Sequence, residues 1–347
     1  MKKLLSFLLL PLLCSVVVSS CSSRIPSTKK EIMDQFVAEK LDPSYVPAAF
    51  FIHFGNDEKV GDAAVQAHLR HFNNSGMDIM KVQFEQSVPH IRDLDLQQTW
   101  DSIRPLPEDF YRPTLEIIQK LQEAVGEDTY VLPTLYSPYQ VARQSLTETG
   151  IVQAAVERPE DLKRVLNYYA DALLWLVKEC KAIGIQGFYM CTQGGEAKFE
   201  AIPGWFEGII RPNDMKVMKE CVKGTKVNIL HICDWEGAYN DLTRYADYPG
   251  QIVNTPIYIA GKYFSVADAV KLFGRPVLGG LDRHKEIVHS SPEELSATVD
   301  SVILASPAGK LMLGAECTVG GASAENIRTA VQAAHTGPSS LHKSRQK

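Results

Sequence analysis

Short apolar runs alternate with longer amphipathic stretches along most of this chain. The apolar runs have the length of β-strands and are rich in β-branched residues, whereas the stretches between them have helical periodicity. This alternation is typical of a parallel sheet that is covered by helices. We expect eight strands, at residues 48–54, 78–84, 129–135, 185–191, 226–233, 251–256, 275–280 and 310–315.

Eight strands of this kind predict a closed α/β barrel, the (β/α)8 or TIM barrel. Two of the helices, at 159–183 and 291–304, begin with proline and acidic residues, which favour the first turn of a helix. The chain has no internal repeat and no low-complexity linker, so a single domain over residues 45–336 is expected. An open, doubly wound sheet is the alternative if the strand count is off by one or two.

Composition places the chain among ordinary globular enzymes. Its 347 residues are 45% hydrophobic and 22% charged. The formal net charge of −5 gives no reason to expect a nucleic-acid partner. The basic tail at 337–347 is expected to be solvated rather than a binding site.

The amino terminus has the features of an export signal. Residues 1–20 combine a basic start with an apolar run, and the sequence VSSC at 18–21 resembles the lipobox of bacterial lipoproteins. We therefore expect a lipidated Cys21, a tether over 21–44, and an exported protein anchored to a membrane at its periplasmic or cell-surface face. An ordinary cleaved signal or a membrane anchor is the alternative, although the apolar run is short for a membrane span.

Three residues at the ends of predicted strands form a candidate metal site. His231 and Cys233 are two residues apart in one apolar run, so in a strand they point to the same face. Cys317 ends another run, and the three side chains would meet if these runs are neighbouring parallel strands. One nitrogen and two sulfur ligands are typical of a catalytic zinc site with an open fourth position. The alternative is a buried cysteine beside a hydrogen-bonded histidine.

Other polar residues follow the predicted strands, where TIM-barrel enzymes place their chemistry. Glu85 and Glu316 are candidate catalytic carboxylates, and either could complete the metal site. The candidate substrate-binding residues are His53, Asn56, Tyr136, Tyr139, Gln193, Asn254 and Asp282.

Several short sequences resemble the uroporphyrinogen decarboxylase superfamily over about residues 45–335. They are PEDL at 159–162, AIGIQG at 182–187, LHIC at 230–233, LGGLD at 278–282, LGAEC at 313–317 and SAENIR at 323–328. The resemblance implies a (β/α)8 barrel, in agreement with the strand count.

The superfamily has two branches, which imply different chemistry. The decarboxylases hold substrate carboxylates with an arginine-rich loop after the first strand, whereas residues 51–56 contain no arginine; their catalytic aspartate and carboxy-terminal histidine correspond to Glu85 and Glu316. The corrinoid-dependent methyltransferases carry an H-x-C motif and a distant cysteine, a pattern that His231, Cys233 and Cys317 match. In that branch zinc activates a thiol, which takes a methyl group from a methylated corrinoid.

The sequence therefore predicts a zinc-dependent, methyltransferase-like enzyme that acts on a small thiol, with a methylated corrinoid as donor. A metal-free decarboxylase of the uroporphyrinogen type is one rival. A lipoprotein that captures a corrinoid or other tetrapyrrole without turnover is another. The known methyltransferases of this type are cytoplasmic, and an exported chain departs from them.

Overall fold

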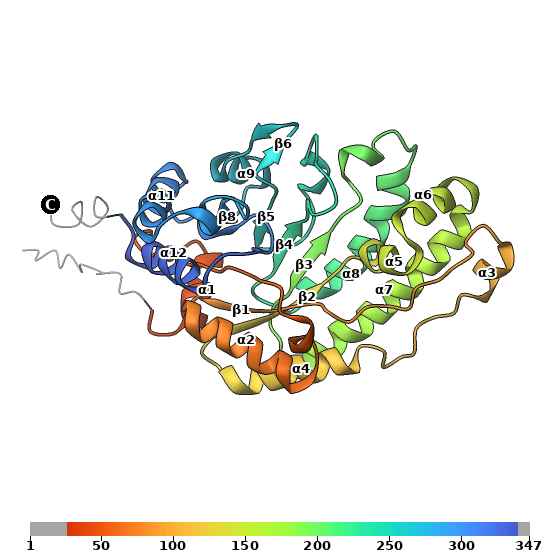
Figure 1. Cartoon of the computed structure of the whole chain (residues 1–347), viewed down its shortest axis with the longest axis horizontal. Coiled ribbons are helices and arrows are strands. Elements are labelled where there is room, and N and C mark those ends of the chain that lie inside the picture. The colour runs from red at the N-terminus through yellow and green to blue at the C-terminus, as the bar shows by residue number, and fades with distance from the viewer. Residues whose placement is uncertain (1–25, 339–347) are drawn as a thin grey trace, which may run out of the picture.

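A computed structural model of the chain describes residues 26–338. Its main sheet has seven parallel strands in the order β1-β2-β3-β4-β5-β8-β9 (Figure 1). These strands are β1 (Ile79–Val82), β2 (Tyr130–Leu135), β3 (Tyr189–Thr192), β4 (Ile229–Ile232), β5 (Ile252–Asn254), β8 (Val277–Leu281) and β9 (Leu311–Ala315). A separate antiparallel hairpin is made of β6 (Tyr258–Ile259) and β7 (Lys262–Tyr263).

The segment at 47–49 closes the sheet into a barrel. Ala48 forms a parallel bridge with Leu313 of β9, and the Ala49 N–H donates to the Leu313 carbonyl at 2.9 Å. On its other side, the Ala48 carbonyl accepts from the N–H of Asp78, directly before β1, at 2.9 Å. The predicted first strand at 48–54 is therefore present only as a short bridge, and it occupies the eighth position of the barrel. The predicted TIM-barrel fold is confirmed.

Each of the seven other predicted strands overlaps an observed one. The clearest difference is at β3, which begins at Tyr189 rather than at residue 185. Just before it, a Cβ added to Gly187 would lie 1.9 Å from the Val227 carbonyl oxygen. Only glycine allows this close approach of the two chain segments that lead into β3 and β4.

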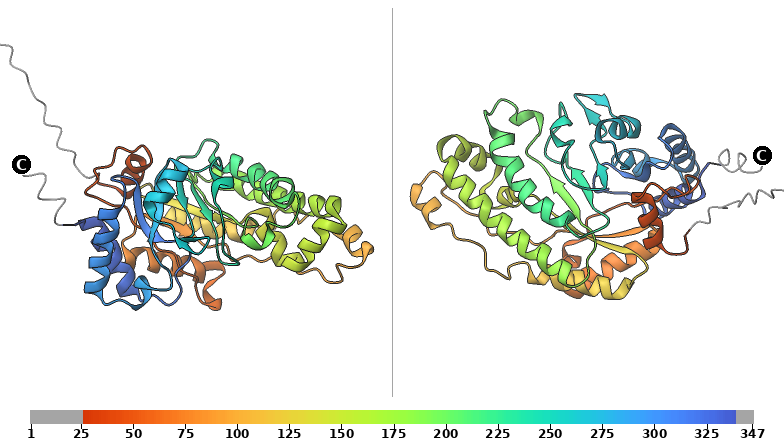
Figure 2. Two further views of the ribbon diagram at one scale, coloured as in Figure 1. Left: turned by 90° about the horizontal axis from the view of Figure 1, so that it is seen from above. Right: turned by 180° about the vertical axis from the view of Figure 1, so that it is seen from behind.

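The helices form an outer layer around the sheet. Within it α2 packs on α4, α4 on α7, α7 on α8, α11 on α12, and α12 on α2 (Figure 2). These helices are α2 (Gly61–Ser75), α4 (Arg112–Val125), α7 (Pro159–Ala182), α8 (Arg211–Val222), α11 (Pro292–Ala305) and α12 (Ala324–Thr336). Shorter helices are α3 (Gln97–Ser102), α5 (Pro138–Leu146), α6 (Glu148–Glu157), α9 (Val266–Phe273) and α10 (Glu286–His289). The two helices predicted at 159–183 and 291–304 are present as α7 and α11.

One predicted boundary is wrong. Residues 21–44 are predicted as a tether, but α1 (Lys29–Val37) lies within this range. Its apolar face, with Ile32, Met33 and Phe36, is buried in the main core, since their spacing of one, three and four residues places them on one side of a helix. Cys21 and the predicted signal lie outside the described residues. Within residues 26–338, no helix is long and apolar enough to cross a membrane.

Candidate metal centre

His231, Cys233 and Cys317 come together at the carboxyl end of the barrel. His231 lies in β4, Cys233 directly follows that strand, and Cys317 lies two residues beyond β9. One ligand atom from each residue fits within 4.8 Å of the other two. All three side chains are buried, so water competes little for these ligand atoms.

The sequence predicts this cluster correctly but gives a wrong reason for it. β4 and β9 are not neighbours, because β5 and β8 lie between them in the sheet. The ligands meet because the sheet curls and both strands direct side chains into the barrel. Curvature of this kind is a property of the closed sheet and is not visible in either strand by itself.

The distance between one pair of ligand atoms fits a tetrahedral metal ion. The Cys317 Sγ and the His231 Nε2 are 3.5 Å apart. Zinc bonds of about 2.3 Å to sulfur and 2.0–2.1 Å to nitrogen, at a tetrahedral angle, place these two atoms about 3.6 Å apart. The other ring nitrogen, Nδ1 of His231, is buried without a hydrogen-bond partner in the described part of the chain. The Nε2 atom is therefore the one that faces the cluster.

The environment of the cysteines favours one thiolate. A hydrogen bond from the Cys233 thiol, helped by His231 and Arg283, lowers the pKa of Cys317 against the opposing effect of burial. The same hydrogen bond, together with burial, raises the pKa of Cys233. The amide Nε2 of Gln193 donates to the Cys233 Sγ at 3.4 Å. A thiolate at Cys317 and a hydrogen-bonded sulfur at Cys233 are suited to binding a cation.

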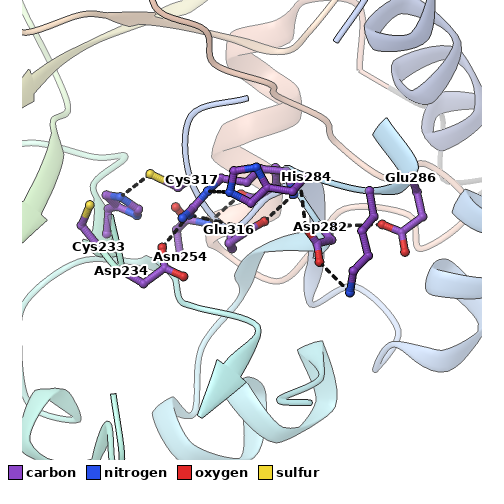
Figure 3. A network of polar contacts seen from close by, with 12 residues as sticks. Cys233, Asp234, Asn254, Asp282, His284, Glu286, Glu316 and Cys317 are labelled. Carbon is purple, nitrogen blue, oxygen red and sulfur yellow. Dashed lines mark hydrogen bonds and ion pairs between the residues drawn. The ribbon is translucent and has the colours of Figure 1, made fainter. Parts of the chain in front are cut away.

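Arg283 links the two chain segments that carry the cysteines. Its Nη1 donates to Asp234 Oδ1 at 2.5 Å and lies 3.6 Å from Glu316 Oε1. Its backbone N–H also donates to Glu316 Oε2 at 2.9 Å. Asp234 follows Cys233, and Glu316 precedes Cys317 (Figure 3). The arginine side chain is 9% exposed. Because both carboxylates bind the same residue, Arg283 holds the two cysteines at a fixed separation.

Replacing Arg283 with Met should weaken zinc binding about 10- to 100-fold, the usual effect of removing a residue that orients metal ligands. Competition with a chromogenic chelator measures this affinity. Lys285→Met is the matched control, since Lys285 lies in the same loop but pairs with Asp282 at 3.1 Å, away from the cysteines. Equal zinc affinity in the wild type and the Arg283 variant would show that the cysteines need no such link.

A cavity of about 250 Å³ opens beside the three ligands. It is lined by the ligands themselves and by polar, cationic and aromatic side chains from several strand ends. The remaining lining residues are His53, Lys81, Gln83, Thr134, Tyr136, Gln140, Arg143, Gln144, Tyr189, Cys191, Gln193, Trp235, Glu236 and Thr318. Its volume is below the roughly 300–1,000 Å³ of pockets that hold drug-sized ligands. The cavity fits a small molecule.

Three of the predicted substrate-binding residues, His53, Tyr136 and Gln193, line this cavity. Four others, Asn56, Tyr139, Asn254 and Asp282, do not. Asn56 is exposed in the short 3-10 helix η1 (Asn56–Glu58), away from the barrel interior.

The other three are held in different surroundings. Tyr139 is buried, with its ring against Phe199 and Trp205. Asn254 accepts from the Tyr189 hydroxyl and donates to the carbonyls of Leu278 and Ala315, so its amide serves the sheet. The Asp282 carboxylate accepts from the His284 N–H and from Lys285. A strand-end position does not reveal which of these groups is used by the fold.

The two carboxylates predicted as catalytic are also engaged elsewhere. Glu85 is 3.1 Å from His53 and 3.3 Å from Lys59, and it lines a different hollow. Glu316 is turned toward Arg283, and burial raises its pKa to about 7. Neither is among the residues whose ligand atoms cluster with the cysteines. In this structure neither fills the fourth position of the metal site.

Two cationic residues of the cavity are missed when only the residues at strand ends are considered. Lys81 of β1 and Arg143 of α5 both line the cavity. Lys81 lies inside a predicted strand, where the alternation of side chains could have placed it on the inner face. Arg143 lies in a helix after β2 and carries no such signal. Neither residue is among the candidate site residues that the sequence predicts.

Comparison with known proteins supports the fold. No protein-family model matches the chain, and no curated protein has a similar sequence. Among solved structures, a methyltransferase from Methanosarcina mazei has a TM-score of 0.69 at 14% identity, over 88% of this chain and 98% of its own. A B12-independent methionine synthase from Shewanella sp. W3-18-1, in complex with selenomethionine, has a TM-score of 0.54 at 13% identity, over 87% of this chain and 99% of its own. At these identities the likeness concerns the fold alone.

Proposed function

We propose that this protein is a zinc-dependent methyltransferase that methylates a small thiol, with a methylated corrinoid as the methyl donor. The observation that carries the proposal is the buried cluster of one imidazole and two thiols beside a cavity at the carboxyl end of the barrel. TIM-barrel enzymes place their chemistry at that end.

The donor set fits zinc better than other common ions. Thiolate ligands select zinc over magnesium or calcium, which prefer oxygen. Three protein ligands leave one position for substrate, as in catalytic rather than structural zinc sites. With two thiolates and a neutral His231, the loaded site would have no net charge. A third, substrate thiolate would then retain much of its nucleophilic character.

Zinc, when bound, would lower the pKa of a substrate thiol so that a nucleophile exists at neutral pH. The protein itself would position the metal ligands and the substrate thiol and shield them from bulk water. Gln193 fixes the Cys233 sulfur, and Arg283 fixes the segments on either side. The small cavity would direct a thiol toward the cluster and keep out bulk water, which strengthens electrostatic interactions there.

Two observations weigh against decarboxylation of a tetrapyrrole. The cavity is small for such a molecule. In addition, Arg143 is already paired with Glu236 at 2.5 Å. Among residues 26–338, this leaves Lys81 as the one lysine or arginine of the cavity without a carboxylate partner, which is too few for a substrate with several carboxylates. The names of the two similar structures, a methyltransferase and a methionine synthase, support methyl-group chemistry on this fold.

The test uses zinc-loaded protein, free methylcobalamin and a panel of small thiols under anaerobic conditions. Absorbance should report loss of the cobalt-bound methyl group, and Cys233→Ser should abolish this loss. Uroporphyrinogen should stay unchanged by chromatography. Zinc-independent loss of carboxylate from the porphyrinogen would favour the decarboxylase instead. Tight corrinoid binding without methyl loss would favour a capture protein.

We also propose that the protein is an exported lipoprotein with lipid on Cys21, which rests on the VSSC sequence after the basic and apolar leader. Acyl chains stabilise membrane attachment by roughly 0.8 kcal/mol per buried methylene, and two or three chains give a stable anchor. Cys21→Ser should therefore move the protein from the membrane to the soluble fraction, measured by fractionation and immunoblotting. A wild-type protein that is already soluble would contradict lipidation, and so would a variant that stays in the membrane.

A further inference from the structure

His53 and Glu85 form a histidine–carboxylate pair at the edge of the cavity. The Nδ1 atom of His53 lies 3.1 Å from the Oε1 atom of Glu85. His53 follows the segment that closes the barrel, and Glu85 follows β1, so two neighbouring positions of the barrel supply the pair. His53 lines the cavity that holds the three metal ligands, whereas Glu85 lines a different hollow. The imidazole therefore reaches the cavity while its carboxylate partner lies outside it.

Glu85 fixes which nitrogen of His53 can accept a proton. Against the opposing effect of burial, the hydrogen bond with His53 and the charge of Lys59, whose Nζ is 3.3 Å from Oε2, lower the pKa of Glu85. An ionised carboxylate only accepts hydrogen bonds, so His53 donates to it through Nδ1. The neutral ring then carries its proton on Nδ1, and the lone pair of Nε2 is available to accept another proton.

The ring of His53 lies beside a segment that carries a metal ligand. Its centroid is 6.1 Å from that of the Trp235 ring, with the two planes at 72°. Trp235 follows Cys233 by two residues and lines the same cavity. A small molecule that reaches the ligands through this cavity therefore passes within reach of the imidazole.

Other groups that line the cavity are less suited to accept a proton and pass it to water. The carboxylate of Glu236 already binds Arg143 at 2.5 Å. Lys81 is only 8% exposed, whereas the His53 side chain is 43% exposed and can release a proton to solvent. Burial raises the pKa of three further lining groups, which therefore keep their own protons at neutral pH: Tyr136, Tyr189 and Cys191.

We propose that His53 is a catalytic base that takes the proton of the substrate thiol at Nε2, and that Glu85 is the positioning residue that fixes its tautomer. The S–H bond breaks, the sulfur keeps the electron pair, and the proton forms an imidazolium that Glu85 stabilises. The imidazolium then gives this proton to water on its exposed side. The thiol comes from the proposed function, on which this inference rests, whereas the tautomer depends on His53 and Glu85 alone.

The first experiment follows the proton itself. Zinc-loaded protein is mixed with 2-mercaptoethanol in weak buffer, and a pH-indicator dye reports proton release by stopped flow. His53→Gln should release as many protons as wild type but about 100-fold more slowly, since a positioned base contributes roughly 10²- to 10⁴-fold. Added imidazole should restore much of this rate, which a merely structural role of His53 would not allow. The difference should shrink above about pH 9, where a thiol with a pKa of about 8.5 is already ionised in solution.

His90→Gln is the matched control, because His90 is an exposed histidine outside the cavity lining. It should release protons at the wild-type rate. Glu85→Ala should slow the release in the same direction as His53→Gln, and both variants should keep the circular dichroism and the zinc content of the wild type. Release at equal rates in wild type and His53→Gln would overturn the role of His53 while leaving the thiol reaction in place.

The second experiment needs neither metal nor thiol. Nitrogen-15 NMR of metal-free protein should show the neutral ring of His53 with its proton on Nδ1, and Glu85→Ala should lose this preference. A wild-type ring with its proton on Nε2 would overturn the inference and leave the proposed function untouched. Zinc-loaded wild type that releases no proton with any small thiol would instead reject the proposed function, and the role of His53 with it, even if the tautomer is as expected.

Discussion

Replacing Cys233 or Cys317 with Ser should remove zinc from the protein, with an affinity loss of at least about two orders of magnitude. Each variant takes away one of three buried ligands that lie within 4.8 Å of one another. A serine hydroxyl is a poor substitute, because it stays protonated at neutral pH and is a harder ligand than a thiolate. Metal content after dialysis against a weak chelator, by atomic spectroscopy, measures the loss.

Cys191→Ser is the matched control for these variants. Cys191 is a buried cysteine that lines the same cavity, but its thiol is not part of the ligand cluster. It should keep one zinc ion per chain. All three variants should keep the circular dichroism of the wild type, since the cluster lies at the carboxyl ends of the strands rather than in the stability face of the barrel. Equal metal content in wild type, Cys233→Ser and Cys317→Ser would rule out the zinc site.

Most strands of the main sheet could be predicted because they are short apolar runs that are buried on both faces. β2 and β9, for example, are buried along their whole length. The first strand could not be predicted in its observed form. The apolar residues at 48–51 are buried as expected, yet only Ala48 is in a bridge. The predicted tether includes α1 because the apolar face of this helix is short. Such a face indicates a packed helix only once its packing partner is known.

The site is predictable only in part, for a physical reason. His231 and Cys233 share a face by strand geometry, and Cys317 ends a recognisable strand. Which group each polar side chain binds depends on tertiary contacts, and these are not visible in the pattern of a single strand. Asn254 was predicted to bind substrate but bonds to the backbone of two strands, while Lys81 was passed over and lines the cavity. Hydrogen bonds of this kind join residues far apart in sequence.

The opposite face of the barrel depends on Asp78, whose side chain is fully buried. Its Oδ2 accepts from the Ala48 N–H at 2.8 Å and lies 2.8 Å from His335 Nε2. Its Oδ1 accepts from the Tyr45 hydroxyl at 2.8 Å. These contacts join the closing segment, β1 and α12. One carboxylate therefore connects the chain that precedes β1 with β1 itself and with the last helix.

Asp78→Ala should lower the free energy of unfolding by about 3–5 kcal/mol, the usual effect of removing one partner of a buried charged network. Three polar groups, on Tyr45, Ala48 and His335, would lose their acceptor where little water can replace it. Urea denaturation followed by circular dichroism measures the change. Asp34→Ala is the control, since Asp34 accepts one bond from Tyr130 at a partly exposed position and should cost about 1 kcal/mol. Equal stability of the two variants would show that Asp78 does not hold the barrel closed.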